Sequence, residues 1–190
     1  MTNTRRARTA FAKTLFFFKG GAWGAFLCFV FFPYGGWHSA YGQTSVRHLG
    51  TFNDWNAWSD GTGRNQVCYI STQPVRSEGK YQRRGPVFLI VAFSRQAPNG
   101  EVSYTSGYPY KKHENPALAV DDNEYDLGLT KGEVAFSLDP AQDPSIILAF
   151  RQGLEAIVDS VSWRGTETRD IFSLKGFSAA WREAIQACPR

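Results

Sequence analysis

The stretch from Ser162 to Cys188 restricts the fold of this chain more than any other, because its hydrophobic period changes once, at a glycine. Before Gly176, apolar and polar residues alternate along 171–175, which is the pattern of a half-buried strand. After Gly176, apolar residues recur at helical spacing as far as Ile185. Ser178 is expected to cap this helix, since its hydroxyl can accept from an unpaired first-turn amide. The stretch therefore predicts a turn at 164–166, a strand, a break and a short amphipathic C-terminal helix.

Short strands separated by close turns account for most of the chain before this stretch. We expect strands at 52–58, 65–72, 87–93, 101–107, 117–120, 124–130, 133–138 and 154–163, with 43–49 as a polar lead-in and 74–85 as a polar loop. The first two strands flank turn residues 59–63 and should form a hairpin. Many short antiparallel strands predict a mainly β fold in one domain, either a β-sandwich or barrel-like antiparallel sheets.

One internal segment departs from the strand pattern. Residues 144–153 suit a short helix with Asp143 as its N-cap, Pro144 at the first helical position and Gly153 just past the end. A buried strand is the alternative for this apolar run. The expected architecture is thus β-sheet with one short internal helix and a C-terminal helix.

Residues 1–42 have the three-part layout of a secretory signal peptide. The segment starts with five cations, continues with an uncharged run at 20–34, and ends in the small-x-small triplet at 40–42. An uncleaved membrane anchor is the alternative, but the run is shorter than the roughly 20 residues that a spanning helix needs. We therefore expect cleavage near Gly42, one domain over 43–190, and a location in the periplasm, with the outer surface as a second location.

Removing the leader changes the charge of the chain. Five of the 21 Lys and Arg residues lie before Gly42, whereas none of the 17 Asp and Glu residues does, so the net charge falls from +4 to −1. The basic balance belongs to the leader and not to the domain. A nucleic-acid partner is therefore not expected.

Cysteine usage agrees with export. Cys28 leaves with the leader, and Cys68 and Cys188 remain as a pair in an oxidising compartment. We expect them to form one disulfide that ties the first hairpin to the C-terminal helix. Two buried free thiols are the alternative.

The order of several motifs resembles the invasion-associated locus B family of exported bacterial proteins. The most specific match is Ser162-Trp163-Arg164-Gly165-Thr166 followed by Asp170-Ile171-Phe172-Ser173-Leu174-Lys175-Gly176-Phe177, and it is supported by Asp54-Trp55, Val67-Cys68-Tyr69, Glu101-Val102-Ser103 and Gly107-Tyr108-Pro109. Phe172 stands where the family usually has Tyr, and Phe136 where it commonly has Trp. The resemblance implies an envelope location and, in some pathogens, a role in host-cell entry. It implies no catalytic residues and no cofactor.

Two short segments of the sequence partly match catalytic or metal-binding motifs. Gly176-Phe177-Ser178-Ala179-Ala180 approximates a nucleophile elbow, although its last position is not glycine, and a base would have to be His48 or His113. A periplasmic hydrolase using Ser178 is therefore an alternative function, and helix capping is the preferred role for this serine. The acidic run 121–126 lacks the glycine of a calcium loop, and the remaining His and Cys residues do not make a zinc set. No catalytic residue, metal or cofactor is predicted.

The best candidate contact patch is the basic set Arg76, Lys80, Arg83 and Arg84 in the predicted loop 74–85. Such a patch can dock on anionic lipid head groups or on an acidic partner, such as an envelope or host protein. Trp55, Trp58, Trp163 and Trp181 are expected in the core and not on a sugar-binding surface. The sequence thus favours a non-enzymatic exported binding protein, with a structural envelope-stability factor as a further alternative.

Overall fold

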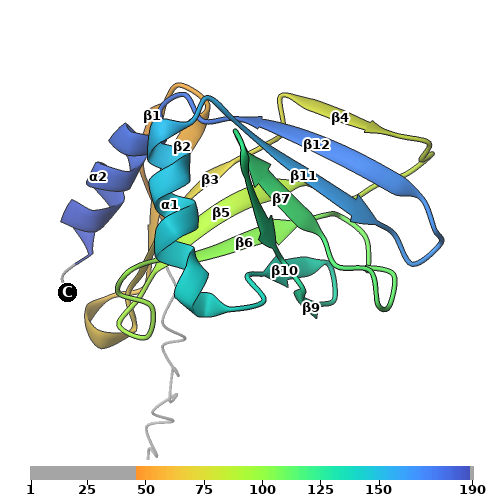
Figure 1. Cartoon of the computed structure of the whole chain (residues 1–190). Helices are drawn as coiled ribbons and strands as arrows, with labels where there is room; N and C mark the ends of the chain where they lie inside the picture. Colours follow the sequence, from red (N-terminus) through yellow and green to blue (C-terminus); the bar gives the residue numbers. More distant parts are fainter. Residues whose placement is uncertain (1–45, 189–190) are drawn as a thin grey trace, which may run out of the picture. The chain divides into compact units, whose positions relative to one another are not determined.

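The computed structural model describes residues 46–188, so the predicted signal segment 1–42 lies outside the described residues. Two antiparallel sheets make up most of the structure (Figure 1). The first contains, in spatial order, β1 (Arg47–Phe52), β2 (Trp55–Asp60), β3 (Val67–Thr72), β5 (Phe88–Phe93), β6 (Glu101–Thr105), β10 (Val134–Phe136) and β9 (Leu129–Lys131). The second contains β4 (Arg76–Gly79), β12 (Glu167–Ser173), β11 (Glu155–Val161), β7 (Ala117–Val120) and β8 (Asn123–Asp126). The sandwich alternative is confirmed, and the sheets do not close into a barrel.

Both predicted helices are present. They are α1 (Asp143–Gln152) and α2 (Phe177–Ala187), and short 3-10 turns occupy Gly63–Asn65 (η1) and Pro140–Gln142 (η2). Helix α1 packs against β6 and β7, whereas α2 packs against β1, β2 and β3. Within residues 46–188, neither helix is long and apolar enough to cross a bilayer.

Strict alternation along the strands separates an inner from an outer face. In β2, β3 and β5 every second residue is buried, because successive side chains point to opposite sides of a pleated strand. The inner rows of both sheets and the buried faces of the helices form one hydrophobic core. Aromatic rings fill the part of this core that lies next to the helices. The Phe177 ring packs edge-on against Trp55 with ring centroids 4.9 Å apart, and its centroid lies 5.4 Å from that of Phe150.

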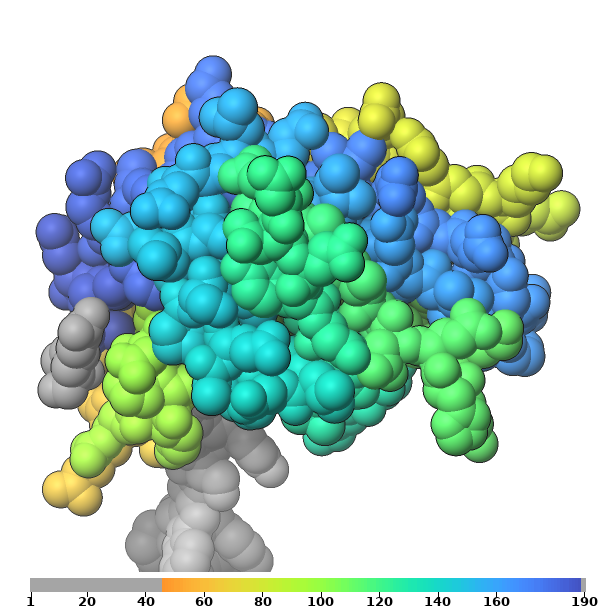
Figure 2. Space-filling model, viewed as in Figure 1, coloured from red at the N-terminus to blue at the C-terminus, as the bar shows by residue number. Residues whose placement is uncertain are grey.

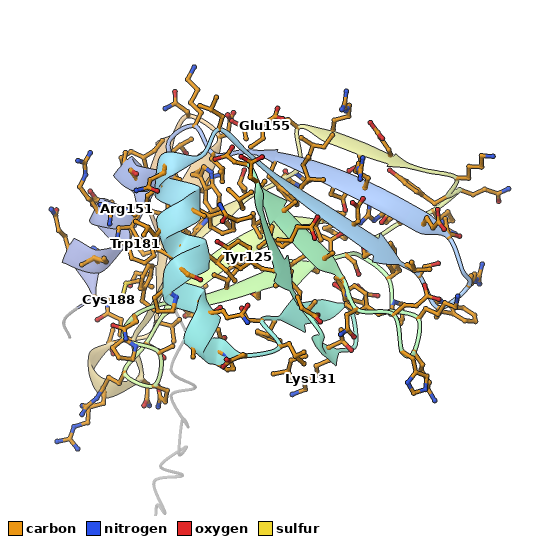
Figure 3. The ribbon with its side chains drawn as sticks, viewed as in Figure 1. Tyr125, Lys131, Arg151, Glu155, Trp181 and Cys188 are labelled. Atoms are coloured by element: carbon orange, nitrogen blue, oxygen red, sulfur yellow. A yellow bond between two sulfur atoms is a disulfide. The ribbon has the colours of Figure 1, made fainter. Side chains whose placement is uncertain are left out.

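The C-terminal stretch folds as its change of period predicts. Gly176 begins α2 as its N-cap, with a φ of 97°, and the backbone of β1 passes directly beside it at Phe52. A disulfide joins Cys68 in β3 to Cys188 just after α2, with the Cα atoms 5.9 Å apart. Trp181 and Cys188 mark the middle and end of this helix in Figure 3, and the Trp181 ring packs edge-on against Phe93 of β5 at 4.5 Å.

Several predicted boundaries were wrong. The lead-in at 43–49 contains the first half of β1, and the loop at 74–85 contains β4. Both are edge strands of their sheets. The single strand expected at 124–130 is two strands in different sheets, because buried Leu127 carries the chain from the second sheet to the first.

Two predicted helix caps were also misplaced. Gln142 is the N-cap of α1, so Asp143 is the first residue inside the helix. Ser178 lies inside α2, where the N-cap is Gly176 and no side-chain capping bond forms. The reason in α2 is the left-handed turn at Gly176, which starts the helix two residues earlier than a serine cap would.

Candidate functional site

A buried ion pair connects the segment after β4 to the middle of β12. Arg84 donates from Nη1 to Oδ1 of Asp170 at 2.8 Å and from Nη2 to Oδ2 at 2.5 Å. The two side chains are only 4% and 0% exposed. A parallel two-bond geometry of this kind fixes the guanidinium plane as well as its charge.

Neighbouring polar groups complete this ion pair. The Tyr104 hydroxyl of β6 donates to Asp170, and the Ser77 hydroxyl of β4 donates to the same carboxylate at 2.6 Å. Arg84 Nε donates to the carbonyl oxygen of Ser106 at 2.6 Å, and Nη2 also donates to the Tyr104 hydroxyl at 2.9 Å. The Tyr108 ring centroid lies 4.9 Å from the guanidinium carbon. The network therefore joins both sheets and β4, and its charges are satisfied inside the protein.

Burial and charge set the ionisation of this network. Burial, together with the adjacent Asp170 carboxylate, raises the pKa of Tyr104 well above its ordinary value. Burial alone would lower the pKa of Arg84, but the hydrogen bonds and charge of Asp170 outweigh it and raise that pKa. Tyr104 thus stays a neutral donor and Arg84 stays a cation across the physiological range. Such a closed network fixes the positions of the two sheets and of β4 relative to one another.

The predicted contact patch is only partly at the surface. Lys80 and Arg83 are exposed, and Arg76 is exposed but pairs with Glu78 at 3.1 Å. Arg84 is not part of the exposed patch, because its side chain is only 4% exposed and its guanidinium donates to Asp170, Tyr104 and Ser106. Only three of the four predicted patch residues are therefore exposed.

Other residues extend the patch at the end of the sandwich away from the helices. Three segments meet there: the chain after β4, the loop 107–114 and the β11–β12 turn. Lys80 and the turn residues Gly165 to Glu167 line one hollow of about 470 Å³, and the amide of Trp163 donates to the Pro109 carbonyl at 2.9 Å. The three segments project at the right of Figure 2 in yellow, green and blue.

We call this surface the basic end. Its members are exposed cations and aromatic side chains: Lys80, Tyr81, Arg83, Lys112, Trp163 and Arg164. Trp163 is 59% exposed, and the Arg164 guanidinium lies 4.7 Å from its ring centroid. Within residues 46–188, none of the four cations forms an ion pair. The basic end thus presents free positive charge beside an exposed indole.

The structure places Ser178 in α2 and the two candidate bases, His48 and His113, in other elements. His48 lies in β1, where its ring contacts Trp58 at 4.6 Å and its Nε2 shares a 3.2 Å hydrogen bond with Thr51. His113 lies in the exposed loop before β7. In the described part of the chain, the Ser178 hydroxyl is in no side-chain hydrogen bond. The acidic run 121–126 forms the β7–β8 hairpin, and no group of three His, Cys, Asp or Glu residues within 46–188 could hold a metal ion.

Comparison with models of protein families shows the family to which the chain belongs. The model of the invasion associated locus B (IalB) protein family matches residues 55–184, which cover β2 through most of α2. The chain belongs to the invasion-associated locus B family. No curated protein and no solved structure matches it.

In the β11–β12 turn of this invasion-associated locus B protein, some motif residues close the turn and others are exposed. The Ser162 hydroxyl accepts from the Thr166 amide at 3.1 Å, and the Ser162 carbonyl accepts from the Gly165 amide at 2.7 Å. Gly165 adopts the positive φ of 83° that closes the turn. Trp163 and Arg164 contribute no side-chain hydrogen bond to this closure. Both side chains are exposed.

The prediction that all four of these tryptophans lie in the core was only half right. Trp55 is fully buried and Trp181 packs against the core, but Trp163 is exposed and Trp58 is half-buried on the outer face of the first sheet. A sequence signal was present for Trp58. It lies three residues after Trp55, and an odd spacing along a strand places two side chains on opposite faces.

Proposed function

We propose that this protein is an exported, non-enzymatic binding protein of the cell envelope, which docks on anionic lipid head groups through the basic end. The observation that carries the proposal is the exposed Trp163–Arg164 pair, set among three further unpaired cations. Indole rings favour the boundary between apolar and aqueous phases, and nearby cations are attracted to anionic head groups.

Export is supported by the layout of residues 1–42 and by the disulfide between Cys68 and Cys188. Disulfides persist in oxidising compartments such as the periplasm. The charge pattern supports the choice of surface. The nearby acids Glu78 and Glu114 are paired with Arg76 and Lys111. Glu167, which lines the same hollow as Lys80, is exposed and forms no ion pair within residues 46–188, but the four free cations outnumber it.

Vesicle co-sedimentation tests the proposal. The protein should sediment with vesicles of neutral phospholipid mixed with phosphatidylglycerol, and much less with neutral phospholipid alone. Each cation near an anionic surface contributes about 1 kcal/mol, so Arg164→Ala should lower the partition coefficient about fivefold. High salt should release the protein, because it screens exposed charges.

A matched control comes from the opposite end of the molecule. Arg151 is an exposed cation on α1, on the helix side of Figure 3, and Arg151→Ala should leave vesicle binding nearly unchanged. Equal binding to neutral and anionic vesicles would refute the lipid proposal. A pull-down from the periplasm then separates the alternatives: a stoichiometric partner would indicate protein binding, and its absence would favour a structural envelope role.

A further inference from the structure

The outer face of the seven-stranded sheet carries a row of three rings in register. His48 of β1 pairs across the strands with Trp58 of β2, which pairs with Tyr69 of β3. The Trp58 and Tyr69 rings are nearly parallel, at 16° with centroids 6.3 Å apart, and the His48 ring lies 4.6 Å from Trp58. The Trp58 indole nitrogen donates to Ser71 Oγ at 3.2 Å. Neighbours on both sides therefore hold Trp58 in one orientation.

A groove of about 320 Å³ runs beside Trp58. The residues that line it are Asp54, Asn56, Trp58, Ser71, Thr72, Gln73, Val75 and Phe88. The rings of Trp58 and Phe88 thus lie beside several polar side chains. The volume of the groove is at the lower end of the range for ligand-binding sites.

The polar side chains of the groove have spare hydrogen-bonding capacity. Asn56 Oδ1 accepts from the Thr51 hydroxyl at 2.7 Å, which leaves its amide nitrogen to donate. Ser71 accepts from Trp58, which leaves its own proton to donate. Among the hydrogen bonds within residues 46–188, none uses the side chain of Asp54 or Gln73. The groove therefore offers both donors and acceptors, with a single charged group.

We propose that this groove binds a neutral carbohydrate, with one face of a pyranose ring packed on Trp58. The C–H groups on one face of a pyranose pack well on an aromatic ring, and its hydroxyls both donate and accept. The polar side chains of the groove match that chemistry. One carboxylate and no cation make the groove unsuitable for a phosphate or sulfate.

A peptide added as a strand does not fit this position. The groove lies over β2, β3 and β5, whose backbone groups are already paired with one another. Strand addition needs an open sheet edge, so a ligand in this groove is bound by side chains alone. The site also lies on a different surface from the basic end, and the proposal stands whether or not the protein binds lipid.

Titration with three neutral trisaccharides, maltotriose, cellotriose and chitotriose, tests the site. The experiment uses protein isolated after expression of the full chain and follows both tryptophan fluorescence and protein-observed NMR. At least one sugar should bind saturably and shift resonances of β2, β3 and β5. Trp58→Ala should weaken that binding about tenfold or more, since it removes the stacking surface.

Two variants separate binding from folding. Gln73→Ala removes an exposed side chain that takes part in no hydrogen bond within residues 46–188, and it should weaken sugar binding while the unfolding midpoint stays unchanged. Trp163→Ala removes the exposed indole of the basic end, and it should leave the sugar dissociation constant unchanged. No shift with any of the three sugars would overturn the proposal, as would binding of equal strength in Trp58→Ala. A concentration-dependent dimer that protects Trp58 would also overturn it, because a second copy would then cover this face.

Discussion

Arg84 and Asp170 form a two-bond ion pair between the sheets, while the next residue toward the N-terminus of β12, Arg169, forms a similar pair with Asp159 on the outer face. The first pair is buried and the second is about half exposed. Adjacent residues of β12 thus form two Arg–Asp ion pairs, one buried and one exposed to water. Comparing substitutions in the two pairs therefore measures how burial changes the contribution of an ion pair to stability.

Replacing Asp170 by Asn should destabilise the protein by about 3–5 kcal/mol, because the Arg84 charge would stay buried without its counter-ion. Urea unfolding followed by circular dichroism measures the change. Asp159→Asn, the outer-face control, should leave the midpoint nearly unchanged, since water screens that pair. The double variant Arg84→Met/Asp170→Leu should recover much of the loss. A small effect of Asp170→Asn would show that the pair is not desolvated.

Gly176→Ala should be strongly destabilising for two reasons. A side chain at a φ of 97° is strained, and its Cβ would overlap the carbonyl oxygen of Phe52. Gly132 is the matched control, because it also has a positive φ, 63°, but its Cβ would meet nothing within 4 Å. Gly132→Ala should cost only the backbone strain of about 1–2 kcal/mol. Equal losses in the two variants would mean that β1 moves aside to admit the new methyl group.

Loss of the Cys68–Cys188 disulfide should lower the free energy of unfolding substantially. The bond closes a loop of 120 residues, and loop-closure entropy gives about 4–5 kcal/mol as an upper figure. Thiol counting under denaturing, non-reducing conditions should find no free thiol in the leaderless protein. Cys188→Ser should then lower the unfolding midpoint, whereas Cys28→Ser should not affect that protein. Two titratable thiols would contradict the prediction.

Stability should fall as the pH rises above about 10. The pKa of Tyr104 is raised in the folded state by burial and by Asp170, whereas the unfolded chain has the ordinary value of 10.0. Above pH 10 the unfolded state therefore loses a proton that the folded state keeps, which favours unfolding. Tyr104→Phe should be less stable at neutral pH but should lose stability less steeply between pH 9 and about 11.

The control for this titration is Ser160→Ala, which removes a hydroxyl that contacts Tyr104 at 3.4 Å and does not ionise in this range. It should keep the alkaline slope of the unmodified protein. Urea unfolding at a series of pH values measures both slopes. An unchanged slope in Tyr104→Phe would show that other groups govern the alkaline loss.

Local patterns in the sequence determined the elements of this protein. Alternation predicted the central strands, and the change of period at Gly176 predicted α2, because strands and helices impose periods of 2 and 3.6 on buried residues. The two cysteines left after the leader predicted the disulfide. The order of the motifs predicted the family that the comparison shows. Each of these inferences uses residues that are close in sequence or an unambiguous pair.

Only the tertiary structure decided which polar and aromatic residues are inside. Arg84 lies among basic neighbours in a polar segment, and its partner Asp170 is 86 residues away, so no local pattern separates it from exposed Arg83. The chain passes from one sheet to the other at Leu127, because the strands before and after it pair in different sheets. Trp163 is exposed because it lies in the turn between β11 and β12, outside the paired strands. Burial is a property of the assembled layers, and it depends on long-range packing that sequence period alone does not specify.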